Sequence, residues 1–210
     1  MAVRASPSDY FLALHRLILG AEVTDRSGRS MGITRGVDAV RSAARQAHAK
    51  GNTVIFIGNG GSAGIASHLA IDFSKNGGIR ALALNDPSAL TCLGNDFGYE
   101  SIFAKQLSFH ARPGDLLVAI SSSGKSPSIL NAVDAARERD CGVVTLSGFG
   151  EDNPLRCRGA VNFYVRSRAY GIVEVAHLAL CHAILDLEMG WRPPRQESQG
   201  MKADADAAIG

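Results

Sequence analysis

The sequence VIFIGNGGS at residues 54–62 decides the fold class of this chain. It is a short apolar run, rich in β-branched residues, that ends in glycine and small polar residues. This form is typical of a buried strand that passes through a tight loop into a helix. The segment LLVAISSSGKS at residues 116–126 has the same form. Because a helix start carries unpaired N–H groups and a partial positive charge, both junctions predict a site for a phosphate group.

Strand-like and helix-like patterns alternate along most of the chain. We expect strands at residues 53–57, 80–84, 115–120, 142–147 and 160–165. We expect helices at residues 7–24, 35–50, 62–75, 87–94, 99–110, 126–138, 153–158 and 171–188. This alternation predicts an α/β fold in which helices cover both faces of a parallel sheet. The expected organisation is N-terminal helices (1–52), an α/β domain (53–190) and a partly disordered tail (191–210).

The composition excludes several classes of protein. The net charge is +2 with no basic run, so nothing indicates a nucleic-acid partner. No apolar stretch approaches the ~20 residues of a membrane span, and the N-terminus has no signal-peptide core. The four cysteines form no CxxC pair, which predicts reduced, mostly buried thiols in a cytoplasmic protein.

The first junction permits a second hypothesis, because GNGGSA at residues 58–63 fits the loose dinucleotide pattern G-x-G-x-x-A. That pattern needs an acidic residue ~20 residues further on, at the end of the next strand. Here the next strand ends at Asn85-Asp86, which is too far downstream and is followed by Pro87. A nucleotide site is therefore disfavoured. That the glycines only let strand and helix pack closely remains an alternative.

The second junction strengthens the phosphate hypothesis. Ser121, Ser122, Ser123 and Ser126 bring four hydroxyl groups to one helix start. Buried hydroxyls need hydrogen-bond partners, so adjacent serines are a poor choice for simple packing. Capping the helix requires one of them, and Ser126 is the expected N-cap because Pro127 suits the first helical position. The others predict a phosphate cradle.

Ionisable residues gather on two of the expected helices. His68 and Asp72 lie four residues apart and share one helix face. Glu174, His177 and His182 lie on the otherwise apolar last helix. A single helical histidine is more often a structural hydrogen-bonding residue. As a set, these residues predict acid–base chemistry, a divalent metal site, or both, because acidic residues on an apolar face need partners.

Five motifs together resemble the sugar isomerase (SIS) domain family, and within it the phosphoheptose isomerases. They are GNGGS (58–62), LGNDFGY (93–99), RPGD (112–115), SSSGKS (121–126) and Glu174-x-x-His177-x-x-x-x-His182. The combination of GNGGS with GNDFG is specific to that family. The resemblance spans residues 53–188 and implies a flavodoxin-like, three-layer fold with five parallel strands, and a homotetramer with active sites between subunits.

The resemblance also implies an activity and a site. The reaction is an aldose–ketose isomerisation through an enediol, converting sedoheptulose 7-phosphate to D-glycero-D-manno-heptose 7-phosphate. Asp72 matches the catalytic base and His182 the partner acid/base. The positions that match zinc ligands are His68, Asp72, Glu174 and His182. The positions expected to contact the sugar phosphate are Asn59, Gly60, Gly61, Ser62, Asn95, Asp96, Ser121, Ser122, Ser123, Ser126 and Glu174.

Two positions depart from the family pattern. Asp72 stands where the family has a glutamate, and Glu174 stands where it has a glutamine. The first change shortens the base by one methylene, and the second favours a tighter, closed zinc site. Both changes motivate an alternative function, a non-catalytic SIS protein that binds a sugar phosphate or associates with a replication initiator.

Overall fold

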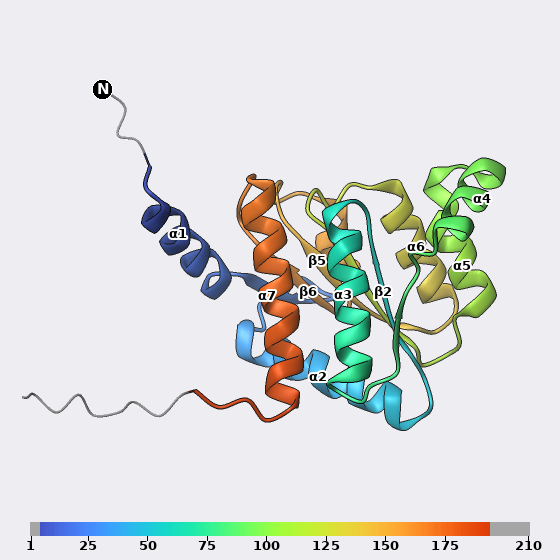
Figure 1. The fold of residues 1–210 in the computed structure, drawn as a ribbon, viewed down its shortest axis with the longest axis horizontal. Coiled ribbons are helices and arrows are strands. Elements are labelled where there is room, and N and C mark those ends of the chain that lie inside the picture. Colours follow the sequence, from blue (N-terminus) through green and yellow to red (C-terminus); the bar gives the residue numbers. More distant parts are fainter. Residues whose placement is uncertain (1–4, 194–210) are drawn as a thin grey trace, which may run out of the picture.

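The computed structural model describes residues 5–193, so most of the predicted C-terminal tail lies outside the described residues. A six-stranded sheet stands between two layers of helices (Figure 1). The strands are β1 (Glu22–Asp25), β2 (Val54–Gly58), β3 (Ala81–Ala83), β4 (Leu116–Ser121), β5 (Gly142–Ser147) and β6 (Val161–Tyr164). The α-helices are α1 (Pro7–Leu19), α2 (Ile33–Ala49), α3 (Gly61–Lys75), α4 (Pro87–Phe97), α5 (Ile102–His110), α6 (Pro127–Glu138) and α7 (Tyr170–Glu188). Two 3-10 helices are η1 (Tyr99–Ser101) and η2 (Pro154–Cys157).

The sheet separates two hydrophobic cores, as the side-chain alternation of β2 illustrates. Val54 and Phe56 pack into a core shared with α2, α3 and α7. Ile55 and Ile57 pack on the opposite face, in a core shared with α4, α5 and α6. Successive side chains of a strand point to opposite faces, so a strand covered on both sides must be apolar throughout. This confirms the predicted α/β fold with three layers.

Five of the strands are parallel, in the order β3-β2-β4-β5-β6. From β2 the chain passes to β3 on one side, and from β4 it passes to β5 on the other. In an open parallel sheet, ligands bind in the crevice that such a reversal leaves at the carboxyl ends of the strands. The two loops singled out in the sequence follow β2 and β4, so both lie at this switch point.

The prediction of one helix over residues 7–24 was wrong at its C-terminal end. Helix α1 stops at Leu19, and β1 follows as an edge strand antiparallel to β6. Val23 is the buried residue of β1, and a Cβ on Gly36 would clash with its Cγ1. Helix α2 therefore packs tightly on β1 because residue 36 has no side chain. The glycine after Leu19 was the signal for the earlier helix end.

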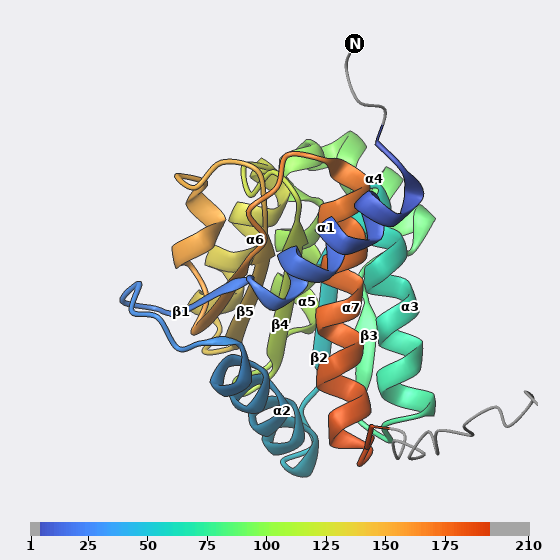
Figure 2. The same cartoon turned by 90° about the vertical axis from the view of Figure 1, so that its left-hand side faces the viewer.

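The expectation that no apolar stretch approaches the length of a membrane span was wrong for helix α7. By length and composition alone, its 19 residues are long and apolar enough to cross a membrane. Eight of them are buried in the structure, including Val173, Ala176, Leu180 and Ile184. The helix is apolar because it packs between the sheet and its helical neighbours, as Figure 2 shows. Its composition is that of a core helix.

The cysteines also differ in part from the prediction. All four are free thiols, and Cys181 is buried, but Cys92 and Cys157 are exposed. Burial raises the pKa of Cys181 to about 12 and that of Cys141 to about 11. These two thiols are therefore unreactive at neutral pH, since the thiolate is the nucleophile.

Candidate functional site

A cavity of about 250 Å³ lies at the switch point, between the loops that follow β2 and β4. It brings together nine of the residues predicted to bind substrate. They are Asn59, Gly60, Gly61, Ser62, Ser121, Ser122, Ser123, Ser126 and Glu174. Ile120 and Tyr170 complete the lining, and neither was predicted. The starts of α3 and α6 both border this cavity, so the partial positive charge of two helix starts lies beside it.

The serine loop leaves hydroxyl groups free for a ligand. Ser126 is the N-cap residue of α6 and Pro127 the first helical residue, as predicted. Within residues 5–193, however, the Ser126 side chain makes no capping hydrogen bond. The Ser122 hydroxyl is buried and has no hydrogen-bond partner in the described chain. A buried hydroxyl without a partner is costly, and an oxyanion in the cavity would supply the missing acceptor.

The loop after β2, at residues 58–61, depends on glycine because backbone and side-chain atoms pass close to it; we call it the glycine loop. A Cβ on Gly58 would lie 2.5 Å from the backbone carbonyl group of Ser62, and Gly60 has a φ of +55°. Both positions therefore favour glycine. A glycine at residue 61 also makes room for Glu174, whose carboxylate lies within 2.7 Å of where a Gly61 Cβ would be. Glu174 thus lies against the start of α3, on one wall of the cavity.

Tyr170 forms part of the same wall and was missed in the sequence. It is the first residue of α7, and its ring meets that of Phe149 edge to face, with the centroids 4.7 Å apart. Phe149 has a φ of +59°, an uncommon conformation for a bulky side chain. An exposed aromatic residue at a helix start was a weak signal, because only the fold brings α7 beside the serine loop.

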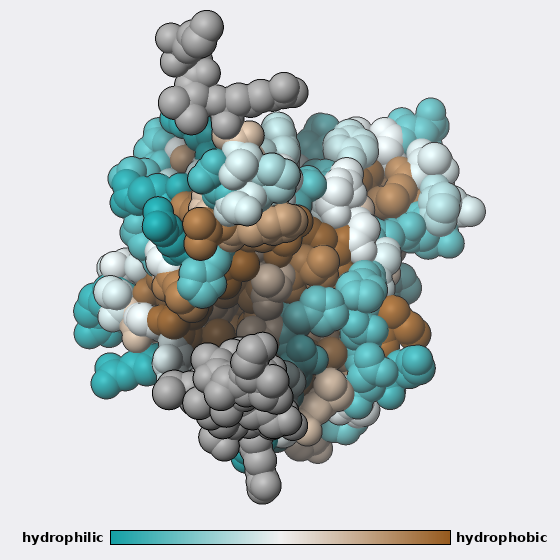
Figure 3. Space-filling model, turned by 60° about the vertical axis from the view of Figure 1, so that its left-hand side comes forward, coloured by the Kyte–Doolittle hydropathy of each residue, from teal (hydrophilic) through white to brown (hydrophobic). Residues whose placement is uncertain are grey.

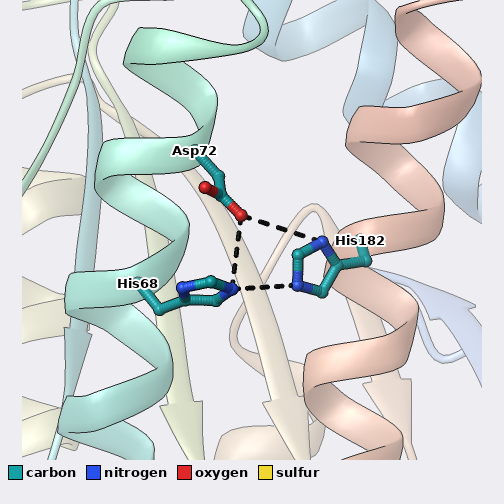
Figure 4. A group of neighbouring side chains, drawn as sticks. All are labelled: His68, Asp72 and His182. Atoms are coloured by element: carbon teal, nitrogen blue, oxygen red, sulfur yellow. Dashed lines mark hydrogen bonds and ion pairs between the residues drawn. The ribbon is translucent and has the colours of Figure 1, made fainter.

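His68, Asp72 and His182 form a cluster between α3 and α7 (Figure 4). The Nε2 atoms of the two histidines are 3.1 Å apart, and His68 Nε2 is 3.2 Å from Asp72 Oδ2. His182 Nδ1 is 4.0 Å from the same carboxylate oxygen. The side chain of Asp72 is 18% exposed and that of His68 is 50% exposed. The cluster is therefore open to small molecules.

These three residues could hold a divalent metal ion, and two imidazoles with a carboxylate are donors that zinc accepts. Each offers one donor atom, and the three donors lie within 4.8 Å of one another. Donor atoms of a tetrahedral zinc ion lie about 3.4 Å apart, given metal–ligand distances near 2.1 Å. The observed spacing fits that requirement with little rearrangement. Three protein ligands would leave one position of a tetrahedral ion open, as in catalytic zinc sites.

Glu174 does not join this group, so the described chain does not form the predicted four-residue closed site. Glu174 precedes His182 by eight residues, and eight residues of helix rise about 12 Å. Glu174 lies opposite Gly61, while His182 lies opposite His68, so α3 and α7 run parallel. The two helices therefore carry two groups of polar residues at different heights, which we call the two levels. The cavity lies at the helix starts, and the His68–Asp72–His182 cluster lies about two turns further along.

His177 belongs to the core and not to the cluster. It is fully buried, and its Nε2 is 3.1 Å from the carbonyl oxygen of Ser147. Burial lowers its pKa to about 4, so the imidazole is neutral at pH 7. The carbonyl can only accept, so Nε2 carries the proton. His177 is therefore a structural hydrogen-bonding residue, the role that sequence alone favours for a single helical histidine.

Asn95 and Asp96 do not line the cavity of the described chain. They lie in the last turn of α4, where both are exposed and Asn95 Nδ2 donates to Asp96 Oδ1 at 2.8 Å. Asp86, the acid considered for a dinucleotide ribose, instead caps α4 by accepting from the N–H of Ala89. This gives Asp86 a structural role and removes the remaining support for a nucleotide site.

Comparison with known proteins agrees with the fold. A model of the SIS domain matches residues 29–148, which is more than half of the chain. The chain belongs to the SIS domain family.

Relatives of the chain include phosphoheptose isomerases. The enzyme of Solidesulfovibrio magneticus is 46% identical over 118 residues, which is 53% of this chain and 58% of that enzyme. The enzyme of a Geobacter species is 32% identical over 161 residues, 74% of this chain and 83% of its own. The structure of the Neisseria gonorrhoeae phosphoheptose isomerase superimposes with a TM-score of 0.73 at 30% identity, covering 86% of this chain and 96% of that one. The chain thus spans little more than half the length of the first of these relatives.

Proposed function

We propose that the chain is a phosphoheptose isomerase, which interconverts sedoheptulose 7-phosphate and D-glycero-D-manno-heptose 7-phosphate. The observation that carries this proposal is the pair of levels along α3 and α7. The substrate holds its phosphate on C7 and its carbonyl at the other end of the carbon chain. A phosphate cavity at one level and an acid–base cluster at the other suit such a molecule. A metabolite with both groups at one end would not need this separation.

In the proposed reaction, Asp72 removes the proton next to the carbonyl and His182 acts as the partner acid/base. The resulting enediol regains the proton on the neighbouring carbon. The serine hydroxyls and the helix starts hold the phosphate. His68, Asp72 and His182 are the residues that would hold a zinc ion, which would supply positive charge next to the enediolate oxygen.

The carboxylate of Asp72, which is shorter than the glutamate expected there, is held in place by neighbouring side chains. Asp72 Oδ2 faces both histidines, while its Oδ1 accepts from the side chain of Asn76 at 3.3 Å. One carboxylate oxygen is therefore held by the helix, and the other faces the cluster. This arrangement favours an aspartate that remains aimed at the reacting centre.

The test is an isomerisation assay with sedoheptulose 7-phosphate in the presence of zinc, on wild type and on Asp72→Asn. We expect turnover by the wild type and a loss of about 100-fold or more in the variant, because general base catalysis contributes 10²–10⁴-fold. Binding of inorganic phosphate should be unchanged, since the cavity lies at the other level. Ser74→Ala is the matched control, because Ser74 lies on the same helix and its hydroxyl donates to the carbonyl oxygen of Ala81, away from the carboxylate.

Two outcomes would contradict the proposal. One is a wild-type protein without turnover, and the other is an Asp72→Asn variant that remains fully active. The alternative, a non-catalytic SIS protein, predicts tight sugar-phosphate binding with no exchange of substrate hydrogen into deuterated solvent. Proton exchange would therefore separate an enzyme from a binding protein even if the sugar differed.

Zinc binding is part of the proposal and can be measured apart from activity. Elemental analysis should find about one zinc ion per chain in the wild type and much less in His68→Ala. Glu174→Gln should retain the metal, because Glu174 lies outside the cluster. Zinc lost equally from both variants would show that Glu174 ligates the metal after all.

We also propose that the chain forms a homotetramer. Helix α1 lies across α7, yet none of the residues Pro7–Leu19 is buried in the described chain (Figure 2). Phe11, Leu12 and Leu19 are more than half exposed. Figure 3 shows hydrophobic residues gathered over this face of the molecule. Large exposed apolar surfaces mark interaction sites, and further copies of the chain would cover this one.

The remaining partner assignments stay predictions. A cytoplasmic location and the lack of nucleic-acid or membrane partners rest on composition and on the family. The sugar-phosphate substrate rests on the cavity and on the relatives.

A further inference from the structure

The GNDFGY motif at residues 94–99 contains Asn95 and Asp96, and neither residue lines the cavity of the described chain. Its last residue, however, reaches back across 40 positions of the chain. The hydroxyl of Tyr99 donates to Oδ1 of Asn59 at 2.9 Å. Asn59 belongs to the glycine loop and lines the cavity. The motif therefore touches the site through one tyrosine hydroxyl.

The other end of the Asn59 amide is held as well. Its Nδ2 donates to the hydroxyl of Ser128 at 2.9 Å. Ser128 is the second residue of α6 and is 1% exposed. Asn59 thus connects the loop after β2 with the start of the helix after β4. Because an amide nitrogen carries two N–H groups, one remains to donate to a ligand.

Tyr99 is itself held in place. Gly98 has a φ of +82°, which turns the chain from α4 into η1. The side chain of Asn131, on α6, donates to the carbonyl oxygen of Glu100 at 3.1 Å. The short segment that carries Tyr99 is therefore fastened to the same helix whose start forms the cavity. The hydroxyl of Tyr99 keeps a defined position relative to Asn59.

Packing gives Tyr99 little other role, since the residue is 61% exposed. An exposed ring contributes little to the stability of the core, so its hydroxyl is the group with a specific partner. Fixing both ends of an amide removes the rotamer freedom that Asn59 would otherwise lose when a ligand binds. The consequence is a cavity wall that is preorganised before binding.

We propose that Tyr99 is a positioning residue, which orients the Asn59 amide for the phosphorylated ligand by a hydrogen bond to Oδ1. As a statement about the isomerase it rests on the proposed function, but it can be tested on phosphate alone. Three segments of the chain then hold one amide: the loop after β2 carries it, the GNDFGY segment orients it, and the start of α6 anchors it. Asn59 touches the ligand, and Tyr99 acts through Asn59.

The experiment is a double-mutant cycle with Tyr99→Phe and Asn59→Ala, measured by calorimetric titration of inorganic phosphate and of sedoheptulose 7-phosphate. We expect Tyr99→Phe to weaken both affinities about three- to tenfold, as loss of one hydrogen bond does. In the Asn59→Ala background the same change should have no further effect. Ser108→Ala, which removes a hydroxyl hydrogen bond on α5, is the matched control and should bind as the wild type.

Kinetics separate positioning from a structural role. Tyr99→Phe should raise KM by the same factor as the dissociation constant and leave kcat within about twofold, because the hydrogen bond acts in binding. Its thermal midpoint should stay within about 2 °C of the wild type. A lowered midpoint with unchanged affinity would mean that Tyr99 only supports the fold.

Each remaining outcome decides one of the two proposals. Equal phosphate affinity in wild type and Tyr99→Phe overturns the positioning role, as does an undiminished effect in the Asn59→Ala background. A wild type that binds no phosphate also overturns it. If phosphate binding behaves as expected but sedoheptulose 7-phosphate is not isomerised, the proposed function fails and the role of Tyr99 stands.

Discussion

His177 and His182 are five residues apart on α7, yet their surroundings give them opposite roles. His177 faces the core, where its imidazole meets only the Ser147 carbonyl oxygen, and burial keeps it neutral. His182 lies on the face toward α3 and meets Asp72 and His68. On a helix, five residues turn through about 500°, so the two side chains point about 140° apart. The position of each residue around the helix therefore decides its chemistry.

The lowered pKa of His177 predicts a loss of stability in acid. The unfolded chain takes up a proton on this histidine near pH 6.5, whereas the folded chain does so only near pH 4. The unfolded state therefore binds more protons between these values, and the free energy of unfolding falls as the pH falls from 6.5 to 4. The contribution of this residue is about 3 kcal/mol at the acid end of the window.

His177→Gln should remove most of this pH dependence while retaining an N–H donor for the Ser147 carbonyl. Urea unfolding at fixed protein concentration, at several pH values between 4 and 7, would measure it. His110→Gln, at the exposed end of α5, should keep the wild-type slope. Identical slopes for wild type and His177→Gln would refute the assignment.

At the scale of elements, the site depends on α3 and α7 running side by side in the same direction. Their starts meet at Gly61 and Glu174, and their middle turns meet at His68 and His182. Two parallel helices repeat their contacts at equal rises, so one pair of elements builds both the cavity wall and the cluster. The loop after β2 sets this arrangement, because it determines where α3 begins.

The same substitution at Gly58 and at Gly64 would test whether the loop after β2 sets the position of α3. Gly58→Ala should destabilise the fold by about 2–3 kcal/mol and weaken phosphate binding, because its Cβ would strike the backbone of Ser62 at 2.5 Å. Gly64→Ala should stabilise the protein by about 0.5–1 kcal/mol, since it lies in α3 with open space around its Cβ. Urea unfolding and phosphate titration measure both. Equal effects of the two substitutions would show that close approach at Gly58 does not shape the loop.

At the scale of the whole molecule, residues 5–193 include an exposed apolar face over α1 and α7. The apolar side chains of α1 and the exposed side of α7 lie together there, which explains why α7 is apolar beyond the residues it buries (Figure 3). Charged networks cover other parts of the surface, such as Glu22 with Arg156 and Arg166. This contrast favours assembly through the α1 face.

Phe11→Glu combined with Leu19→Glu places two charges on one stripe of α1 and should convert tetramers into smaller species. Light scattering coupled to size-exclusion chromatography would show the change in mass. Phe109→Glu is the matched control, since Phe109 is 62% exposed but lies on α5 in the opposite helical layer. A monomeric wild type, or a double variant that stays tetrameric, would rule out this interface.

Much of the fold could be predicted from local sequence. Apolar runs that end in glycine or serine marked β2, β4 and β5, and the alternation of strand and helix patterns predicted the three layers. β1 could not be predicted in the same way, because only Val23 is buried and its strand exists by pairing with β6, more than 130 residues away. Edge strands depend on a partner and carry a weak local pattern.

The site, too, has parts that local sequence predicts and parts that depend on contacts between distant elements. Sequence alone was enough to predict that the two loops border one site and that His68 and Asp72 share a helix face, because each is a local motif whose geometry follows from a helix start or from the pitch of one helix. The tertiary structure decided what depends on distance between elements: Glu174 at the cavity wall and not in the cluster, Tyr170 beside the serines, and Tyr99 bonded to Asn59. Spacing along one helix specifies direction and rise, but only the packing of that helix against its neighbours specifies what its side chains meet.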